Sequence, residues 1–205
     1  MPYLSENINV HPNGEIQSQN GKWIMMEWER EIMEASARAI CINGGDILNV
    51  GFGMGIIDSH IQLLKPKTHW IVEGHPEVQK KIIEDGWLQK PNVKVIFKPW
   101  QEVYKNLPKF DGIYFDTWED NQTNFDLEIG NLLKPKGIYS FFNNPGRDKN
   151  YWVRDDLFIH TQQVSNFTNL NIEFDHMLIN SSIPSGLHYW PHHLRLYPIP
   201  KISLK

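Results

Sequence analysis

Three glycines stand within five positions in "DILNVGFGMGIIDSH" (residues 46–60), directly behind a short apolar run. The run is typical of a buried strand, and the residues after the glycines are typical of a helix. In an α/β sheet a strand-to-helix loop lies at the carboxyl edge, where such folds bind their ligands. Gly51, Gly53 and Gly55 permit positive φ angles and let a ligand lie against bare backbone. A tight turn would use the same residues, so the loop by itself is weak evidence.

An acidic residue, Glu73, ends the next apolar run, "HWIVE" (69–73). It follows the glycines by about 20 residues, the interval at which a carboxylate can accept both hydroxyls of a ribose. The glycine loop and this acid together predict an adenosine-type cofactor. The Gly-x-Gly-x-Gly spacing departs from the Gly-x-Gly-x-x-Gly of dinucleotide-binding proteins, which argues against a nicotinamide-dependent oxidoreductase.

The third apolar run leads into "FKPWQEV" (97–103), which the same architecture would place beside an adenine. Pro99 and Trp100 offer an apolar slot and Gln101 offers a polar edge, a combination that suits a purine. The alternative for Trp100 is equally strong, because a tryptophan often packs its own helix into the core.

Two carboxylates are candidates for the chemistry. Asp116, in "FDGIYFDTWED" (110–120), falls at the carboxyl end of the fourth strand, over the reactive part of a bound cofactor. A carboxylate there could bind a cation, act as a base or simply cap a turn. Glu29 stands among charged neighbours in "EWERE" (27–31), a pattern that by itself indicates a solvated helix face.

The elements that must position these residues alternate between strands and helices. We expect strands at 47–50, 69–73, 93–97, 110–116 and 137–142, and helices at 26–41, 56–64, from 76, from 100 and before 132–137. This alternation predicts an α/β fold with a mostly parallel central sheet and helices on both faces. Beyond residue 150 we expect a helix at 154–165 and two strands, within 171–179 and 187–200, that end the sheet as an antiparallel pair.

Length and composition limit the remaining possibilities. A chain of 205 residues with 40% hydrophobic content can close one core, so we expect an irregular arm at 1–22 and a single domain at 23–205. The net charge of −4 argues against nucleic acid as a partner. Neither a secretory signal nor a bilayer-length apolar run is present, which predicts a soluble, cytoplasmic protein without membrane contact.

The chain offers little to a metal ion. A single cysteine excludes an internal disulfide and a cysteine-cluster site. The ending "HYWPHH" supplies His188, His192 and His193, but adjacent side chains on a strand point to opposite faces. We therefore predict no metal site.

Several stretches in order resemble S-adenosylmethionine-dependent guanidino N-methyltransferases, a group that includes guanidinoacetate N-methyltransferase and the arginine methyltransferases that modify the δ-nitrogen. The stretches are "MMEWEREIMEASA", "ILNVGFGMGIID", "HWIVEGHPEV", "PWQEV", "FDGIYFDTWED", "LLKPKGIYSFFN" and "HYWPHHLRLYPIPKISLK". The resemblance covers most of residues 23–145, with a weaker echo at the C-terminus. It implies a Rossmann-like class I methyltransferase fold and S-adenosyl-L-methionine as cofactor.

The resemblance also implies roles for matching positions. The cofactor-binding residues would be Met33, Gly51, Gly53, Met54, Glu73, Gly74, His75, Pro99, Trp100 and Gln101, and the substrate-binding residues would be Glu29, Asp116, Thr117 and Asn143. Two carboxylates can hold a planar guanidinium bidentately, and methyl transfer to its nitrogen requires loss of a proton. We expect Asp116 to be the base and Glu29 to orient the substrate.

The substrate stays open between guanidinoacetate, free arginine or a related small guanidine, and an arginine side chain in a peptide. "EGHPEV" is closer to the arginine-modifying members, whereas the long N-terminal region of those enzymes is lacking. Arg147 or Arg154 could pair with a substrate carboxylate. The alternative function is a non-catalytic S-adenosylmethionine-binding regulatory protein, which the intact carboxylates disfavour; homodimerisation is left open.

Two positions depart from the group's pattern. Asn49 stands where guanidinoacetate enzymes carry an acid, and Lys136 replaces a turn glycine in "LLKPKG". The exchange at position 136 costs little if Gly137 takes the strained backbone conformation in place of that glycine.

Overall fold

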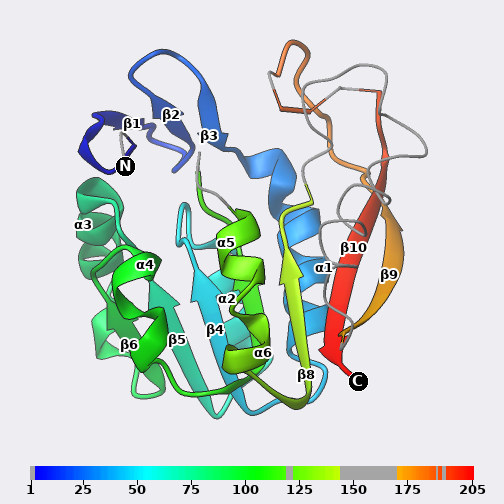
Figure 1. Cartoon of the computed structure of the whole chain (residues 1–205). Coiled ribbons are helices and arrows are strands. Elements are labelled where there is room, and N and C mark those ends of the chain that lie inside the picture. Colours follow the sequence, from blue (N-terminus) through cyan, green and yellow to red (C-terminus); the bar gives the residue numbers. More distant parts are fainter. Residues whose placement is uncertain (1–2, 119–121, 144–169, 188, 191–192) are drawn as a thin grey trace.

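A seven-stranded sheet in the order β6-β5-β4-β7-β8-β10-β9 forms the centre of the molecule (Figure 1). The computed structural model describes residues 3–118, 122–143, 170–187, 189–190 and 193–205. The strands are β4 (Asp46–Val50), β5 (Thr68–Val72), β6 (Val93–Ile96), β7 (Phe110–Phe115), β8 (Leu133–Phe141), β9 (Leu170–Leu178) and β10 (Leu196–Leu204). Strands β4 to β8 are parallel, and β10 pairs antiparallel with both β8 and β9. The predicted α/β fold with an antiparallel C-terminal pair is therefore confirmed.

Helices cover both faces of this sheet (Figure 1). One face carries α1 (Arg30–Ile40), α2 (Ile56–Leu63) and α3 (Pro76–Glu84), and the other carries α4 (Trp100–Val103), α5 (Gln122–Asp126) and α6 (Ile129–Leu132). Short 3-10 turns complete the set as η2 (Glu27–Glu29), η3 (Trp87–Gln89) and η4 (Tyr104–Asn106). Among the described residues, no helix has the length and apolarity needed to cross a membrane.

The alternation of side chains along β4 explains why this strand is apolar on both sides. Leu48 and Val50 belong to the core under α4 to α6, whereas Ile47 packs with α1 and α2. Asn49 follows the same parity as Ile47 and contacts Asp58 of α2. A central parallel strand is buried on both faces, so Asn49 is a fully buried polar residue in an otherwise apolar strand.

The N-terminal segment differs from the irregular arm that we expected. It forms a 3-10 turn, η1 (Tyr3–Ser5), and a three-stranded antiparallel sheet of β1 (Ile8–Val10), β2 (Ile16–Ser18) and β3 (Trp23–Met25). The glycines of "PNG" and "QNG" take positive φ in the two turns, so residues that indicated a loop instead close hairpins. Ile16 is fully buried and packs with Phe52 of the glycine loop, which ties this small sheet to the large one.

Other boundaries moved by short distances. The helix predicted at 26–41 begins with the 3-10 turn η2, and β8 begins at Leu133, ahead of the predicted 137. Lys136 itself has a φ of 66°, while Gly137 is outside the positive-φ region, so the expected exchange of strain to Gly137 is wrong. A Cβ on Gly137 would meet Leu133 and the carbonyl of Phe110, so this glycine is required for packing. The helix predicted at 154–165 lies outside the described residues.

Candidate active site

The predicted site lies where the strand order reverses, between β4 and β7. Successive connections leave the sheet in opposite directions there, which opens a crevice at the carboxyl ends of the strands. The glycine loop follows β4, Glu73 follows β5 and Asp116 follows β7. Parallel pairing of β4 with both neighbours brings the three ends to one edge, at the top of Figure 1.

The glycine loop has the backbone conformation that its composition indicated. Gly51, Gly53 and Gly55 have φ angles of 92°, 53° and 71°. A Cβ on Gly51 would overlap the carbonyl oxygen of Asp116, and one on Gly53 would lie 2.5 Å from Sδ of Met25. Side chains are therefore excluded at both positions, and the loop offers its backbone as a cradle.

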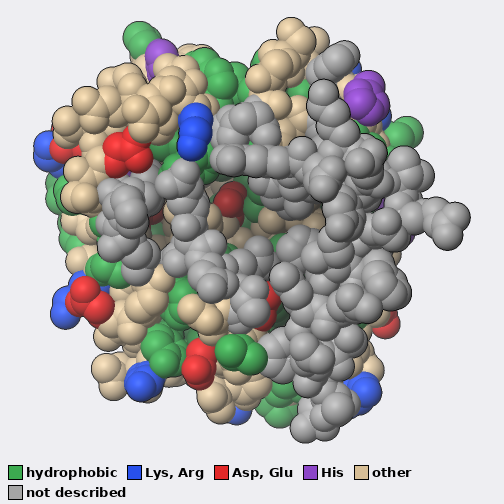
Figure 2. Space-filling model, turned by 45° about the horizontal axis from the view of Figure 1, so that its top comes forward, with side chains coloured by type: hydrophobic (Ala, Val, Ile, Leu, Met, Phe, Trp, Pro, Cys, Tyr) green, Lys and Arg blue, Asp and Glu red, His purple; other side chains and the backbone are tan. Residues whose placement is uncertain are grey.

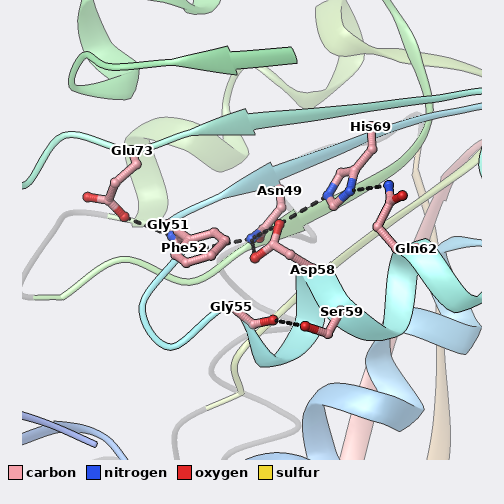
Figure 3. Close-up of polar contacts among 9 residues, drawn as sticks. All are labelled: Asn49, Gly51, Phe52, Gly55, Asp58, Ser59, Gln62, His69 and Glu73. Carbon is pink, nitrogen blue, oxygen red and sulfur yellow. Dashed lines mark hydrogen bonds and ion pairs between the residues drawn. The ribbon is translucent and has the colours of Figure 1, made fainter. Parts of the chain in front are cut away.

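Glu73 lies at one end of this cradle and binds it directly (Figure 3). Its Oε2 accepts a hydrogen bond from the Phe52 N–H at 2.8 Å, and its Oε1 accepts one from the His75 N–H at 2.6 Å. Burial raises the pKa of Glu73, and the backbone N–H groups oppose that rise. Each carboxylate oxygen has a second lone pair, so the group can still accept hydroxyl donors.

The loops after β5 and β6 meet beside Glu73. A Cβ on Gly74 would lie 3.3 Å from the Pro99 Cα, so bare backbone again faces a neighbouring loop. His75 is the N-cap of α3, with Nδ1 accepting from the Glu77 N–H at 3.2 Å. Gly74 therefore lies beside Pro99, one of the residues that we expect at the adenine.

Trp100 belongs to the core. Its ring centroid lies 5.1 Å from that of Phe125 and 5.9 Å from that of Phe115, and only 5% of the residue is exposed. The packing alternative for this side chain is therefore the one that the structure supports. Gln101, next in α4, is half-buried.

Two methionines pack behind the loop. Met33 of α1 is fully buried in a cluster with Met25 and Tyr114. The Met54 N–H points at Sδ of Met25, 3.2 Å away. Met25 was not among the site residues predicted from the sequence. The apolar run "WIMM" that contains it indicates burial only.

Glu29 is a buried carboxylate, contrary to the solvated helix face that its charged neighbours indicated. Only 2% of it is exposed. Its Oε1 accepts from the Met26 N–H at 3.0 Å and from the Tyr189 hydroxyl at 2.7 Å. Burial raises the pKa of Glu29 to about 8; the Tyr189 hydrogen bond opposes that rise, and the negative charge of Asp116 adds to it.

Asp116 faces the same site from β7. Burial raises the pKa of its carboxyl to about 7. Among the described residues, no donor is hydrogen-bonded to this carboxylate. Two acids with raised pKa values at one sheet edge are the expected property of a site built to receive a cation.

Buried polar groups surround the two acids. Burial raises the pKa values of the Tyr114, Tyr189 and Tyr197 phenols, and the charges of Glu29 and Asp116 contribute to each rise. Tyr197 accepts a hydrogen bond from the Asn143 N–H at 2.7 Å. Sequence reasoning missed Tyr189 and Tyr197, although the first lies in the quoted "HYW".

Two further predicted residues contribute acceptors. Within the described part of the chain, Oδ1 of Asn143 and Oγ1 of Thr117 are buried without a hydrogen-bond partner. Such atoms are costly unless a ligand donates to them. Arg147, Arg154, His188 and His192 lie outside the described residues.

Comparison with known proteins agrees with this geometry. The family model described as guanidinoacetate N-methyltransferase matches residues 11–191. "Protein arginine N-methyltransferase 2" of Saccharomyces cerevisiae is 39% identical over 161 residues, which cover 72% of this chain and 39% of that protein. The protein of the same name from Yarrowia lipolytica is 36% identical over 208 residues, which cover 93% of this chain and 43% of that protein. The chain thus spans about two fifths of the length of these relatives.

A solved structure supports the fold. The precorrin-6y C5,15-methyltransferase of Geobacter metallireducens GS-15 superposes with a TM-score of 0.62 at 14% identity, covering 85% of this chain and 88% of that one. At such low identity the likeness concerns the class I methyltransferase fold alone. The family match spans most of the sequence, including the glycine loop and both acids. The chain therefore belongs to the guanidinoacetate N-methyltransferase family.

Proposed function

We propose that this chain transfers a methyl group from S-adenosyl-L-methionine to a guanidino nitrogen, and that the acceptor is an arginine side chain. The observation that carries the proposal is the pair of acids, Glu29 and Asp116, whose pKa values of about 8 and 7 mark a site suited to a cation. The names of the relatives, at 36% to 39% identity, support arginine as the acceptor.

The residues present fit this cofactor. A Cβ on Gly51 would meet the Asp116 carbonyl and one on Gly53 would meet Sδ of Met25, so the loop keeps glycine at both positions and we assign the cofactor to its backbone. Glu73 is buried beside the cradle with lone pairs to spare for ribose hydroxyls. When bound, the cofactor supplies an electrophilic methyl group on a positively charged sulfonium.

A guanidinium suits the two acids better than an ammonium does. It is planar, carries five donors in a fixed fork and keeps its charge, because its pKa lies above about 12. When the guanidinium enters, each acid gains a hydrogen-bonded positive charge. That charge lowers the pKa of each carboxyl and so favours its ionised form. Binding therefore releases protons and stabilises two carboxylates that are otherwise poorly solvated.

The two acids differ in how they are held. Within the described ranges, both hydrogen bonds to Glu29 go to Oε1, and we assign its other oxygen to the substrate. Asp116 has no such restraint among the described residues. We assign Glu29 to orientation and Asp116 to proton removal, since the guanidino nitrogen must lose a proton as its lone pair forms the new bond.

An acidic hollow favours a polypeptide acceptor over a small guanidine. Trp28, which precedes Glu29, lines a surface hollow whose charged residues are Glu15, Glu27, Glu31 and Arg30; Arg30 pairs with Glu27, which leaves Glu15 and Glu31 as an excess of negative charge. Figure 2 shows the carboxyl edge of the sheet, where acidic side chains are visible and one is recessed near the centre of the face. Negative potential beside the site attracts basic residues that flank an arginine.

The test has two stages. Calorimetric titration with S-adenosylhomocysteine measures cofactor binding, and mass spectrometry then follows methylation of arginine peptides, free arginine and guanidinoacetate. We expect binding, and a gain of one methylene mass on a basic peptide that is faster than on either small guanidine. Preference for guanidinoacetate would overturn the polypeptide assignment, and absence of binding would overturn the function.

A further inference from the structure

A chain of polar side chains runs beneath the glycine loop, on the α2 side of the sheet (Figure 3). Asn49 of β4, Asp58 of α2 and His69 of β5 are all fully buried, and half-buried Gln62 of α2 continues the chain. Three buried polar side chains in a row are costly unless each finds partners. None of these residues has a role in the proposed reaction.

The Asn49 amide uses both of its protons. Its Nδ2 lies 2.8 Å from the carbonyl oxygen of Gly51 and 3.0 and 2.9 Å from the two carboxylate oxygens of Asp58. The reverse orientation would set the amide oxygen against three acceptors, so the donor orientation is fixed by its surroundings. One N–H thus serves the glycine loop and the other serves the buried carboxylate.

The carboxylate has a second neighbour on its other side. Oδ1 of Asp58 lies 3.0 Å from Nε2 of His69, and Nδ1 of His69 lies 3.0 Å from Nε2 of Gln62. The Gln62 amide donates to Nδ1, which assigns the ring N–H to Nε2; this nitrogen lies close to Asp58 but is not aligned for a hydrogen bond to it, so the contact is one of proximity. Asp58 also lies in the first turn of α2, where the helix dipole favours negative charge.

The chain of contacts ends on one peptide of the glycine loop. Asn49 donates to the carbonyl of Gly51, and Glu73 accepts from the N–H of Phe52. These two groups belong to the same planar peptide unit, so its rotation is blocked at both ends. The orientation of this peptide is set by ψ of Gly51 and φ of Phe52, and these are the torsions that the two hydrogen bonds restrain.

We propose that Asn49, held by Asp58 and His69, is a positioning residue that presets the Gly51–Phe52 peptide and thereby sets the affinity for the adenosyl cofactor. The inference rests on the proposed function, since it assigns the cofactor to this loop. Without the Asn49 donor the peptide loses one of these two restraints and keeps the hydrogen bond to Glu73, so cofactor binding must restrict its remaining motion at a cost in affinity.

The decisive variant exchanges the two side chains, as Asn49→Asp with Asp58→Asn. The pair keeps one carboxylate facing one amide, and an amide oxygen at position 58 can lie beside His69 as the Asp58 oxygen does. The donor to the Gly51 carbonyl is lost, and a carboxylate oxygen that cannot donate faces that carbonyl in its place. We expect the dissociation constant for S-adenosylhomocysteine, measured by calorimetry, to rise about tenfold or more, the effect of leaving a hydrogen-bonding group unpaired. The melting temperature should stay close to that of the parent chain.

Ser59→Ala is the matched control. The Ser59 hydroxyl donates to another glycine-loop carbonyl, that of Gly55, at 2.7 Å, but the Ser59 N–H already bonds the same oxygen at 3.0 Å. We expect its cofactor affinity to be unchanged. An exchanged pair that binds as tightly as the parent chain would overturn the inference.

A second variant keeps the inference testable if the exchanged pair does not fold. Asn49→Ala removes the same donor and leaves Asp58 its His69 partner, and it should weaken S-adenosylhomocysteine in the same direction. In turnover assays either variant should raise KM for S-adenosylmethionine more than it lowers kcat. Unfolding of both variants would show a role in stability instead and would equally overturn the inference. A parent chain that binds no S-adenosylhomocysteine would instead remove the proposed function.

Discussion

The Tyr189 hydroxyl donates a 2.7 Å hydrogen bond to Oε1 of Glu29, across 160 positions of sequence. It opposes the rise in the pKa of Glu29 that burial causes. It also fixes one oxygen of the carboxylate, so that the other can face a guanidinium. The C-terminal segment therefore helps to build a site whose other components come mainly from the first 143 residues.

Tyr189→Phe should impair the guanidino acceptor and spare the cofactor. Loss of the hydroxyl removes one of the two hydrogen bonds that described residues make to Glu29 and leaves that from the Met26 N–H, so the carboxylate is less restrained and harder to ionise. We expect kcat/KM for the acceptor to fall about tenfold. The pH profile should move to higher pH, because the pKa of Glu29 rises further. A profile that stays in place would show that the hydroxyl acts only in packing; Tyr104→Phe, at the opposite face, is the control.

Glu29→Gln should change how stability depends on pH. The pKa of Glu29 in the folded chain, about 8, lies above the ordinary 4.5, so the native state binds more protons than the unfolded state between these values. The free energy of unfolding of the ligand-free chain therefore falls as pH rises through that window. The variant should lose part of this slope and be more stable at pH 8, by an amount on the order of a few kcal/mol.

Urea unfolding at pH 5 and pH 8 measures that slope. Glu31→Gln, two positions along in α1, is the control, because hydrogen bonds from Ser181 and Asn180 lower the pKa of Glu31. Both pH values lie above the pKa of Glu31, so replacing this carboxylate should change the free energy of unfolding by the same amount at pH 5 and at pH 8. A Glu29→Gln variant with an unchanged slope would contradict the buried, proton-binding state of this acid.

Asp116→Asn should abolish methyl transfer while leaving S-adenosylhomocysteine affinity close to that of the parent chain. The amide cannot accept the proton that the guanidino nitrogen must lose. Single-turnover measurements with an arginine peptide, alongside calorimetry, separate the two effects. Equal loss of binding and transfer would refute the assignment of Asp116 as the base.

Glu73→Ala should have the opposite profile. It removes the acceptor for ribose hydroxyls and also frees the Phe52 and His75 N–H groups that organise the loop. Cofactor affinity should weaken by about tenfold to a hundredfold, as expected for hydrogen bonds to a charged group. Calorimetry measures the dissociation constant for S-adenosylhomocysteine. An unaltered value would refute the assignment of Glu73 to the cofactor site.

Lys136→Gly should stabilise the chain by about 1 kcal/mol, because the Cβ of a non-glycine residue at a φ of 66° is strained. Gly137→Ala is the informative counterpart, since its new Cβ would meet Leu133 and the Phe110 carbonyl. We expect this second variant to lose stability in thermal unfolding. Equal melting temperatures for the two would contradict the placement of strain at Lys136.

The sequence alone determined the features that depend on short stretches of chain. The glycine loop, Glu73 and Asp116 each directly follow a strand that its own apolar residues predict, and parallel strands bring their carboxyl ends to one edge. The order of strands and helices follows from the same local periodicity. These parts could be predicted because neighbouring residues carry the physical cause.

Only the tertiary structure decided the features that depend on contacts distant in sequence. Glu29 reads as a solvated residue until Tyr189 and the C-terminal strands cover it, and Trp100 joins the core because Phe115 and Phe125 lie beneath it. Asn49 was visible only as a departure from a pattern until folding set it between Asp58 and Gly51. Burial and hydrogen-bond partners are properties of the packed chain, and no local pattern contains them.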